Sequence, residues 1–270
     1  MWRGLRYLAL LIHMIFVQIS DTHVTRAGDR TNHSGDPGVT LARCVERLQR
    51  MAPAPDAILA SGDLVNLGEE AEYERLRGLL APLAMPVYLI PGNHDLRAPL
   101  RSVFHQHDYL PCDRSSICYC IERHSVRLIA LDTVTEGVEG GTLEDQQLGW
   151  LEQTLAIAPE RPTIIVMHHP PFRTGLACMD EIALAGDSAR SLGKIIERYP
   201  CVERILCGHV HRTIHARWHG TTVSVCPSTA FQMAFDLRDE AAFTGSAEPP
   251  AYQVHCWNGE QLVTHTVSVT

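Results

Sequence analysis

The sequence predicts an α/β domain built on a mostly parallel sheet. Up to Gly208, short apolar runs alternate with segments of helical periodicity, which is the pattern of repeated βαβ units. The chain has 270 residues and is 45% hydrophobic, so it is long enough to bury one large sheet on both faces. After Gly208 apolar and polar residues alternate, which predicts antiparallel strands.

Six apolar runs are predicted to form the strands of the first part. Each is short, rich in aliphatic residues and followed by polar ones, as in strands that are buried on both faces. They are residues 15–19, 57–60, 87–90, 126–131, 163–167 and 204–207.

Between these runs, apolar residues recur every three or four positions and predict amphipathic helices. Three of the helices are expected over residues 40–51, 69–80 and 188–199. A fourth is expected to begin at Thr142, where Asp145 takes the third position of a capping box, ahead of an apolar face that contains Leu148, Leu151 and Leu155.

The last part of the chain is predicted to form an antiparallel sheet packed beside the first sheet. Its expected strands are residues 213–217, 221–226, 252–257 and 262–269, and His219-Gly220 and Asn258-Gly259 mark turns between them. The polar segments 27–38 and 236–250 are expected to be rim loops.

The net charge of −8 argues against nucleic acid as a habitual partner, because such binding usually needs a basic surface. A phosphate ester can still bind if metal ions supply local positive charge.

The N-terminus resembles a signal peptide only superficially. Its apolar run continues without a small-residue cleavage site into Ser20-Asp21 and is too short to span a membrane. We therefore expect a cytoplasmic protein without a membrane partner. Residues 1–13 are expected to be a non-native or disordered extension, and residues 14–270 a single domain.

The nine cysteines do not follow the spacing of a zinc ribbon. A zinc knot or disulfide among Cys112, Cys118 and Cys120 is one interpretation. We favour buried, reduced thiols, with Cys207 and Cys226 inside strand-like runs.

Five polar segments follow apolar runs, and each contains residues that can bind metal. Because the carboxyl ends of parallel strands meet at one edge of a sheet, these segments are expected to converge. They read Asp21-Thr22-His23, Gly62-Asp63, Gly92-Asn93-His94-Asp95, His168-His169-Pro170 and Gly208-His209-Val210-His211.

The residue types in these segments suit a pair of divalent cations. Asp21 and His23 are two positions apart and can point the same way, and the Asp63 carboxylate has two oxygens that can bridge two ions. Oxygen and nitrogen ligands without thiolate fit Mn, Fe, Co or Zn. Two such ions about 3.5–4 Å apart can clamp the attacking and leaving oxygens of a displacement at phosphorus.

The five segments resemble the signature blocks of the calcineurin-like metallophosphoesterase superfamily. Within it, the chain is similar to class III cyclic-nucleotide phosphodiesterases and most closely to bacterial glycerophosphodiesterases of that group. The closer similarity rests on residues 61–66, 88–95, 167–171 and 207–209, and the likeness spans roughly residues 15–257. It implies a four-layer sandwich in which two facing mixed β-sheets are flanked by helices.

The resemblance also implies a function and a set of site residues. It implies a binuclear phosphodiesterase that hydrolyses glycerophosphodiesters or 3',5'-cyclic nucleotides by attack of a metal-bound hydroxide on phosphorus. His94 would be the catalytic residue that protonates the leaving alkoxide or stabilises charge on the phosphoryl oxygens, and the loops 172–184 and 231–250 are candidate lids. One metal would be held by Asp21, His23 and His211, the other by Asn93, His168 and His209, with Asp63 shared between them.

Other polar residues near these segments are assigned supporting roles. His169 is expected to hydrogen-bond near the ligands without binding metal. Asn66 and Asp95 are expected to do the same, and Asp132 could either orient a histidine or cap its strand.

Two further enzymatic interpretations use the same site, a phosphomonoesterase and a nuclease, and the net charge disfavours the nuclease. A non-catalytic scaffold would be expected to lack Asp63 or His94, and both are present. Exposed edges of the C-terminal strands make self-association into a homo-oligomer an additional expectation.

Overall fold

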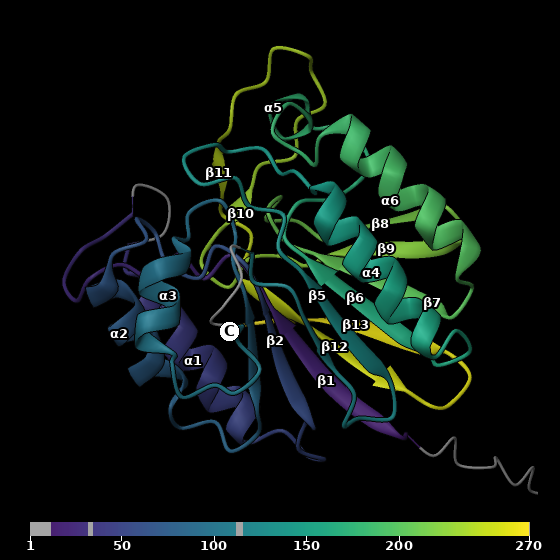
Figure 1. Ribbon diagram of the computed structural model, residues 1–270. Coiled ribbons are helices and arrows are strands. Elements are labelled where there is room, and N and C mark those ends of the chain that lie inside the picture. Colours follow the sequence, from purple (N-terminus) through teal and green to yellow (C-terminus); the bar gives the residue numbers. More distant parts are fainter. Residues whose placement is uncertain (1–11, 32–34, 112–115, 270) are drawn as a thin grey trace, which may run out of the picture.

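The protein folds into four layers, with two β-sheets packed face to face and helices on both outer sides (Figure 1). The computed structural model describes residues 12–31, 35–111 and 116–269. The prediction of two facing mixed sheets flanked by helices is confirmed.

The first sheet combines the N-terminal and the C-terminal strands of the chain. Its order is β13-β12-β1-β2-β3, in which β1 to β3 run parallel and β12 and β13 are added antiparallel. The strands are β13 (Leu262–Ser268), β12 (Ala251–Trp257), β1 (Met14–Ile19), β2 (Ala57–Ser61) and β3 (Val87–Ile90).

The second sheet contains the central strands. Its order is β4-β5-β6-β7-β9-β8, with β5, β6, β7 and β9 parallel and the two edge strands antiparallel. The strands are β4 (Tyr119–Ile121), β5 (Arg127–Leu131), β6 (Thr163–Met167), β7 (Val202–Cys207), β9 (Thr221–Val225) and β8 (Ile214–Trp218).

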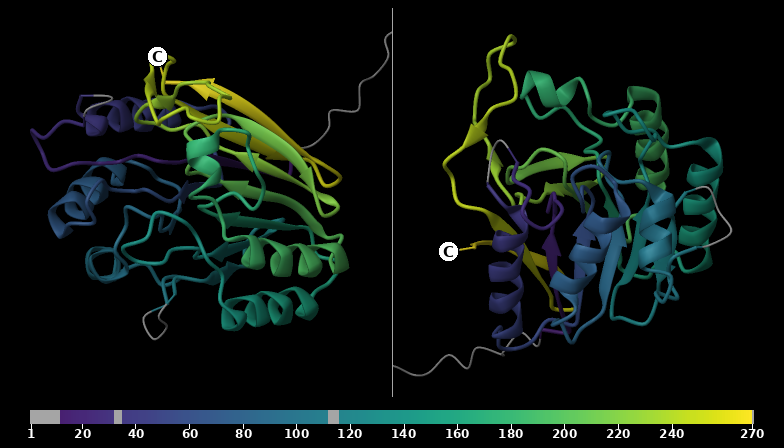
Figure 2. Two further views of the ribbon diagram at one scale, coloured as in Figure 1. Left: turned by 90° about the horizontal axis from the view of Figure 1, so that it is seen from above. Right: turned by 90° about the vertical axis from the view of Figure 1, so that its left-hand side faces the viewer.

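Each sheet has its own set of helices. Figure 2 shows α1 to α3 beside the first sheet and α4 and α6 beside the second. The short helix α5 lies near the hairpin β10–β11 at the top of Figure 1. The bounds are α1 (Pro37–Gln49), α2 (Glu70–Leu80), α3 (Arg97–Val103), α4 (Asp145–Ile157), α5 (Ala177–Asp180), α6 (Gly186–Arg198), β10 (Gln232–Met233) and β11 (Gly245–Ser246).

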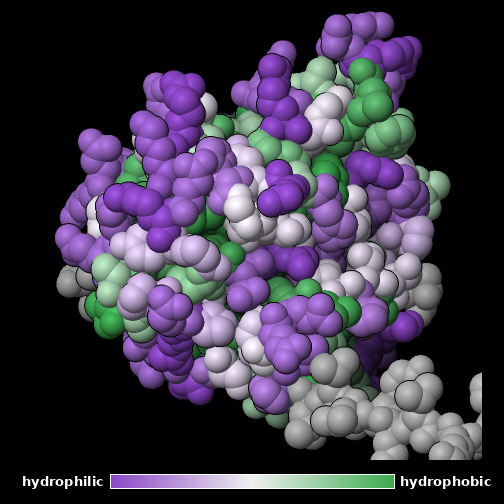
Figure 3. All heavy atoms as spheres, turned by 90° about the vertical axis from the view of Figure 1, so that its right-hand side faces the viewer, coloured by the Kyte–Doolittle hydropathy of each residue, from purple (hydrophilic) through white to green (hydrophobic). Residues whose placement is uncertain are grey.

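Two hydrophobic clusters hold the layers together. One joins α1, α2 and the first sheet to the inner face of the second, where Leu128, Ile164 and Leu206 lie. The other fills the space between the outer face of the second sheet and α4 and α6. Hydrophilic side chains cover most of the face drawn in Figure 3, with hydrophobic ones in small groups between them.

The prediction of a separate C-terminal antiparallel sheet is wrong. β9 joins the second sheet parallel to β7, and β12 pairs antiparallel with β1. Alternation along a strand reports which side is buried and says nothing about which strand is its neighbour, so the sequence pattern could not assign these strands to the sheets.

The start of the fourth helix also differs from the prediction. Its cap is Glu144, which forms a capping box with Gln147, two residues after the expected pair of Thr142 and Asp145. Glutamate is an unusual residue at this position, so the preference for Thr pointed to the wrong residue.

Several expectations about the chain ends and the thiols fall partly outside the described residues. Residues 1–11 of the expected extension and Cys112 lie outside the described residues. The eight described cysteines are free thiols. Within the described residues, no helix has the length and apolar character needed to cross a membrane.

Candidate active site

All five polar segments lie at the carboxyl edges of parallel strands. They follow β1, β2 and β3 in the first sheet and β6 and β7 in the second. Because the two sheets face each other, their carboxyl edges bring segments that are far apart in the sequence into contact, as in the pair His23 and His211, which are 188 positions apart.

The first group of side chains consists of Asp21, His23 and His211. The Nε2 atoms of His23 and His211 are 3.0 Å apart, and His211 Nε2 is 3.5 Å from Asp21 Oδ1. With Asp63, these residues offer four ligand-type atoms that all lie within 4.8 Å of one another.

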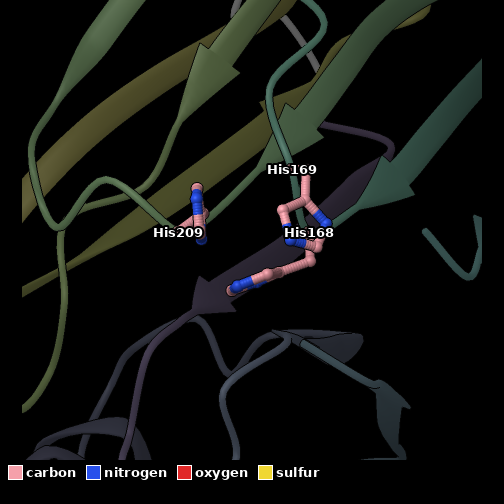
Figure 4. A group of neighbouring side chains, drawn as sticks. All are labelled: His168, His169 and His209. Carbon is pink, nitrogen blue, oxygen red and sulfur yellow. The ribbon is translucent and has the colours of Figure 1, made fainter. Parts of the chain in front are cut away.

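The second group consists of Asn93, His168 and His209. His168 Nε2 lies 3.2 Å from Asn93 Oδ1, and the rings of His168 and His209 are 5.1 Å apart between centroids. Figure 4 shows these two rings together with that of His169 at the ends of their strands.

Asp63 lies between the two groups and presents one oxygen to each. Its Oδ1 is 3.3 Å from His168 Nε2, and its Oδ2 is 3.7 Å from His23 Nε2. The carboxylate is almost fully buried, with 2% of the residue exposed. This placement is the one a carboxylate needs to bridge two cations.

The donor set fits cations better than it fits hydrogen bonding within the protein. His211 Nδ1 lies 2.9 Å from the carbonyl oxygen of Phe231, and His168 Nδ1 lies 2.9 Å from that of Ser61. In the neutral form of each ring, these contacts place the proton on Nδ1 and leave the lone pair of Nε2 facing the site. His209 Nε2 is buried without a hydrogen-bond partner among the described residues, so lone pairs converge there without donors to match them.

Burial also keeps two of the imidazoles neutral. It lowers the pKa of His23 and of His209 well below the ordinary value, and neighbouring histidines lower both further. For Asp63, burial raises the pKa, but the electrostatic interactions with His168 and His94 and the hydrogen bond with His168 outweigh this and hold the pKa well below its ordinary value. A neutral imidazole and an ionised carboxylate are the forms that bind metal.

The backbone is unusual at five of the seven predicted ligands. These five adopt the left-handed region, in which residues other than glycine are uncommon and cost about 1–3 kcal/mol each. They are Asp21 (φ 50°), His23 (φ 42°), Asp63 (φ 48°), His209 (φ 74°) and His211 (φ 53°). Such conformations persist where the surroundings fix them, and they cluster at functional sites.

His94 stands beside the two groups and not between them. Its backbone N–H donates to Asp63 Oδ1 over 2.9 Å, and its Nδ1 lies 2.8 Å from the carbonyl oxygen of Asn66. Partial loss of hydration lowers the pKa of His94. The charge of Asp63, the hydrogen bond to the Asn66 carbonyl and the charge of Asp95 outweigh this effect, so the pKa is raised. His94 is therefore protonated more easily than a free imidazole, and in the imidazolium form its Nε2–H is a donor.

His169 and Asp95 lie next to the proposed ligands and form hydrogen bonds that stabilise the site. His169 is buried, with Nδ1 2.7 Å from Thr133 Oγ1 and Nε2 3.0 Å from the carbonyl oxygen of Glu139, so both nitrogens are engaged. Asp95 accepts hydrogen bonds from the backbone N–H groups of Leu64 and Gly92. It thereby ties the loop of Asp63 to the loop of Asn93.

Asp132 does not orient a ligand histidine. It accepts two hydrogen bonds from Arg97, of 2.6 and 2.9 Å, and others from the backbone of Ile117 and Val134. The residue that contacts a histidine here is its neighbour Thr133, and a single threonine at the end of a strand gave no signal in the sequence.

A cavity of 470 Å³ opens above the two groups. Its walls include residues of both loops predicted to be near the substrate, as well as Glu139 from a loop that the sequence did not single out. Besides His23, Asp63, Asn93, His94, His209 and His211, the cavity is lined by Thr31, Asn66, Glu139, Cys178, Met179, Glu181, Ile182, Phe231 and Phe243.

Residues 14–213 match the family of calcineurin-like phosphoesterases. The chain belongs to this family. The match covers all five segments of the site, and the convergence of nitrogen and oxygen ligands described above is what a binuclear divalent metal centre of a calcineurin-like phosphoesterase requires.

Bacterial phosphodiesterases of this family are similar to the chain over most of its length. A probable glycerophosphodiester phosphodiesterase of Arcobacter nitrofigilis is 34% identical over 94% of this chain and 92% of its own. A 3',5'-cyclic adenosine monophosphate phosphodiesterase of Vibrio vulnificus is 33% identical over 90% of this chain and 86% of its own.

Solved structures share the fold at lower sequence identity. A dimetal phosphatase from Danio rerio has a TM-score of 0.71 and 14% identity, and the match covers 96% of this chain and 97% of that one. A purple acid phosphatase from yellow lupin seeds also has a TM-score of 0.71, with 16% identity, 95% of this chain covered and 51% of that one.

Proposed function

We propose that this calcineurin-like phosphoesterase hydrolyses small phosphodiesters, either glycerophosphodiesters or cyclic nucleotides, at a two-metal site. The observation that carries the proposal is the position of Asp63, with Oδ1 toward His168 and Oδ2 toward His23. The two named relatives described above, a glycerophosphodiesterase and a cyclic-nucleotide phosphodiesterase, support it.

The proposed ligands follow the two groups in the structure. Asp21, His23 and His211 would hold one ion, and Asn93, His168 and His209 the other, with Asp63 shared. Divalent ions at such a site supply positive charge for the phosphoryl oxygens and make water a stronger acid.

The chain's own contribution to the chemistry is the proton on His94. The contact between Nδ1 and the Asn66 carbonyl fixes the ring, and the raised pKa favours the imidazolium form, in which Nε2 carries a proton. From the cavity wall, Nε2–H can either give its proton to the alkoxide that leaves phosphorus or donate a hydrogen bond to a phosphoryl oxygen.

The first test is turnover of bis(p-nitrophenyl) phosphate with Mn²⁺, before and after chelation. Turnover that depends on the metal supports the proposal, and equal rates under both conditions would refute it. Parallel assays with a monoester and an oligonucleotide rank the diesterase activity against the two alternatives.

Asp63→Ala tests the bridging assignment. The variant removes both oxygens that face the two groups, so we expect it to bind one ion at most and to lose nearly all turnover. Metal content by mass spectrometry checks this. A variant that keeps two ions would show that Asp63 does not bridge them.

We also infer a reducing cytoplasmic setting and self-association. Free thiols at the eight described cysteines support the first inference. For the second, β13 is the outer strand of its sheet, and such an edge can pair with another copy. Light scattering across a concentration series measures the oligomeric state.

A further inference from the structure

Two glutamines lie between the two sheets, close to the carboxyl edges that carry the proposed ligands. Gln18 on β1 and Gln253 on β12 are neighbours in the first sheet, because they are partners in the antiparallel register of these strands. Both residues are 0% exposed. The layer between the sheets also holds the apolar side chains of the first hydrophobic cluster, Leu206 among them. Two primary amides buried at this depth need a physical explanation.

Each glutamine donates a hydrogen bond to the facing sheet. Gln18 Nε2 is 2.9 Å from the carbonyl oxygen of Cys207, the last residue of β7. Gln253 Nε2 is 3.3 Å from that of Val225, the last residue of β9. Cys207 and Val225 are themselves register partners. Two neighbouring amides of one sheet therefore bridge to two neighbouring carbonyl groups of the other. Because a carbonyl oxygen can only accept, the atom that faces it must be the amide nitrogen.

This arrangement costs stability, because only one end of each amide is used. Oε1 of Gln18 and Oε1 of Gln253 are buried and have no hydrogen-bond partner in the part of the chain that the structure describes. Such an atom costs free energy, whereas an apolar side chain of the same shape can be neutral or stabilising. The Cys207 carbonyl oxygen also accepts from Cys226 N, over 2.9 Å, so it keeps a partner without Gln18. Stability of the fold therefore does not account for these amides.

The contacts of Gln18 lead to proposed ligands of both metal groups. Besides its bond to the facing sheet, Gln18 Nε2 donates to Ser61 Oγ over 2.8 Å, and Ser61 Oγ donates to Ser20 Oγ over 2.9 Å. Ser20 directly precedes Asp21. The carbonyl oxygen of Ser61 lies 2.9 Å from His168 Nδ1. One buried amide is therefore linked to one proposed ligand of each group.

The two sheets approach each other closely at this point. Gly208, the residue after β7, packs so tightly on the first sheet that a Cβ there would lie 2.9 Å from Asp21 Oδ2 and from the Ser61 carbonyl oxygen. The next N–H group along the chain, that of His209, donates to Asp21 Oδ1 over 3.0 Å. A change in the separation of the sheets would therefore move His209 relative to Asp21.

Gln253 has the corresponding position at the end of β9. The segment that follows β9 supports the backbone of Asp21, since Ser228 Oγ donates to the Asp21 carbonyl oxygen over 2.7 Å. Ser228 Oγ also accepts from Phe231 N, over 3.2 Å, and the Phe231 carbonyl oxygen is the one that faces His211 Nδ1. By holding the end of β9 against the first sheet, Gln253 acts on a second pair of proposed ligands.

We propose that Gln18 and Gln253 are positioning residues of the metal centre. Their amides hold the ends of β7 and β9 at a fixed distance from β1 and β12, and this distance sets the spacing between ligands that come from different sheets. The proposal rests on the proposed two-metal diesterase function. It explains why the fold gives up stability at two buried amides, because two ions act together only at a separation of about 3.5–4 Å.

The test replaces each amide by methionine, which has a side chain of similar length and donates no hydrogen bond. Gln18→Met, Gln253→Met and the double variant are compared with the wild type and with His255→Phe. His255 is the matched control, because it lies on the same face of β12 as Gln253. It is also 0% exposed, and its buried Nε2 has no partner among the described residues. Its Nδ1 lies 2.9 Å from Thr264 Oγ1 of the same sheet, so this contact does not bridge the sheets.

Three quantities are measured at pH 7.5. They are the Mn²⁺ affinity by calorimetry, the coupling between two bound Mn²⁺ ions by electron paramagnetic resonance, and the urea midpoint of the metal-free protein in excess chelator. Each single variant should bind the second Mn²⁺ about tenfold more weakly and the double variant about 100-fold, the usual range for groups that support metal ligands. The spectrum of the coupled pair should change, whereas the urea midpoint should equal or exceed that of the wild type. His255→Phe should leave affinity and spectrum unchanged.

Wild-type Mn²⁺ affinity and a wild-type spectrum of the coupled pair in the double variant would refute the positioning role. A urea midpoint below that of the wild type in both single variants would assign the amides to fold stability and refute it as well. If the double variant does not fold, the single variants decide. None of these readouts needs a substrate. Absence of metal-dependent turnover of bis(p-nitrophenyl) phosphate by the wild type would therefore refute the diesterase function separately, and Mn²⁺ binding would still decide the positioning role.

Discussion

Replacement of Gly92 by alanine tests whether the site depends on a close approach between two loops. Gly92 precedes Asn93, and a Cβ at this position would collide with both the backbone nitrogen and Oδ1 of Asp63 and would lie 2.8 Å from His168 Cε1. Asp63 cannot move away freely, because its Oδ1 also accepts from His94 N. The added methyl group must therefore displace Asp63, His168 or the loop of Asn93.

The size of the effect follows from this collision. Overpacking of a well-packed interior costs about 1–3 kcal/mol, which lowers the melting temperature of a domain of this size by about 2–5 °C. A displacement of about 1 Å at a catalytic centre reduces turnover by about 10²-fold. We therefore expect Gly92→Ala to lose at least one of two bound Mn²⁺ ions and to be about 10²-fold slower on bis(p-nitrophenyl) phosphate.

Gly78→Ala is the matched control for this substitution. Gly78 lies on the exposed face of α2, where an added Cβ would have no heavy atom within 4 Å. The same chemical change there should stabilise the protein by about 0.5–1 kcal/mol and leave turnover unchanged. Metal content, melting temperature and kcat are measured for both variants. If Gly92→Ala keeps two ions and turns over within threefold of the wild type, the close approach is not what positions Asp63.

Three further predictions address the proton donor, a buried ion pair and the pH dependence of stability. His94→Ala should keep both metal ions and slow turnover by about 10²–10⁴-fold, as checked by metal analysis and kcat; loss of metal would identify His94 as a ligand. Asp132→Ala should lower the free energy of unfolding in urea by about 3–5 kcal/mol, because it leaves Arg97 without its buried partner, and an unchanged midpoint would contradict this. Burial, and then the nearby Arg204 and His215, lower the pKa of His255 to about 3, so below pH 6.5 the unfolded chain takes up a proton that the folded protein cannot. The contribution of neutral His255 to the free energy of unfolding is therefore fully present well above pH 6.5 and falls by about 2 kcal/mol at pH 5. Urea unfolding of the wild type and of His255→Phe at pH 7.5 and pH 5 checks this, because the variant should lose about 2 kcal/mol less than the wild type between the two pH values.

The sequence predicted most of the local structure because the strands are short and buried on both faces. β3 (Val87–Ile90) and β6 (Thr163–Met167) have the predicted bounds, since each apolar run is closed by a Pro or His at its carboxyl end. β4 (Tyr119–Ile121) was missed, because three residues with a cysteine in the middle do not form a recognisable apolar run. α3 (Arg97–Val103) was missed because Pro99 lies within its first turn, where proline is tolerated but reads as a helix breaker.

The sequence predicted the residues at the floor of the candidate site, but it did not predict all the residues that form its walls. The floor is made of His, Asp and Asn residues directly after strands, and strand ends are fixed by the sheet. The walls are made by Glu139, Glu181 and Phe243, which lie on loops whose paths depend on contacts such as that between Gly141 and Leu184. No periodicity marks such contacts, so the composition of the cavity mouth, and with it the substrate preference, emerges only from the fold.

The left-handed backbone at the proposed ligands explains why the site must sit on these two sheets. A side chain on a regular strand points to one face or the other, and both faces are filled by the core. A left-handed residue directly after a strand breaks this alternation and turns the side chain toward the cavity at the carboxyl edges of the sheets. The conformation is held because the ladder continues past the strands, with Asp21 N bonded to Gly62 O at 3.0 Å and His23 N bonded to Asp63 O at 2.9 Å. These hydrogen bonds therefore hold Asp21, His23 and Asp63 in their left-handed conformation and fix their positions relative to one another, as a binuclear centre requires.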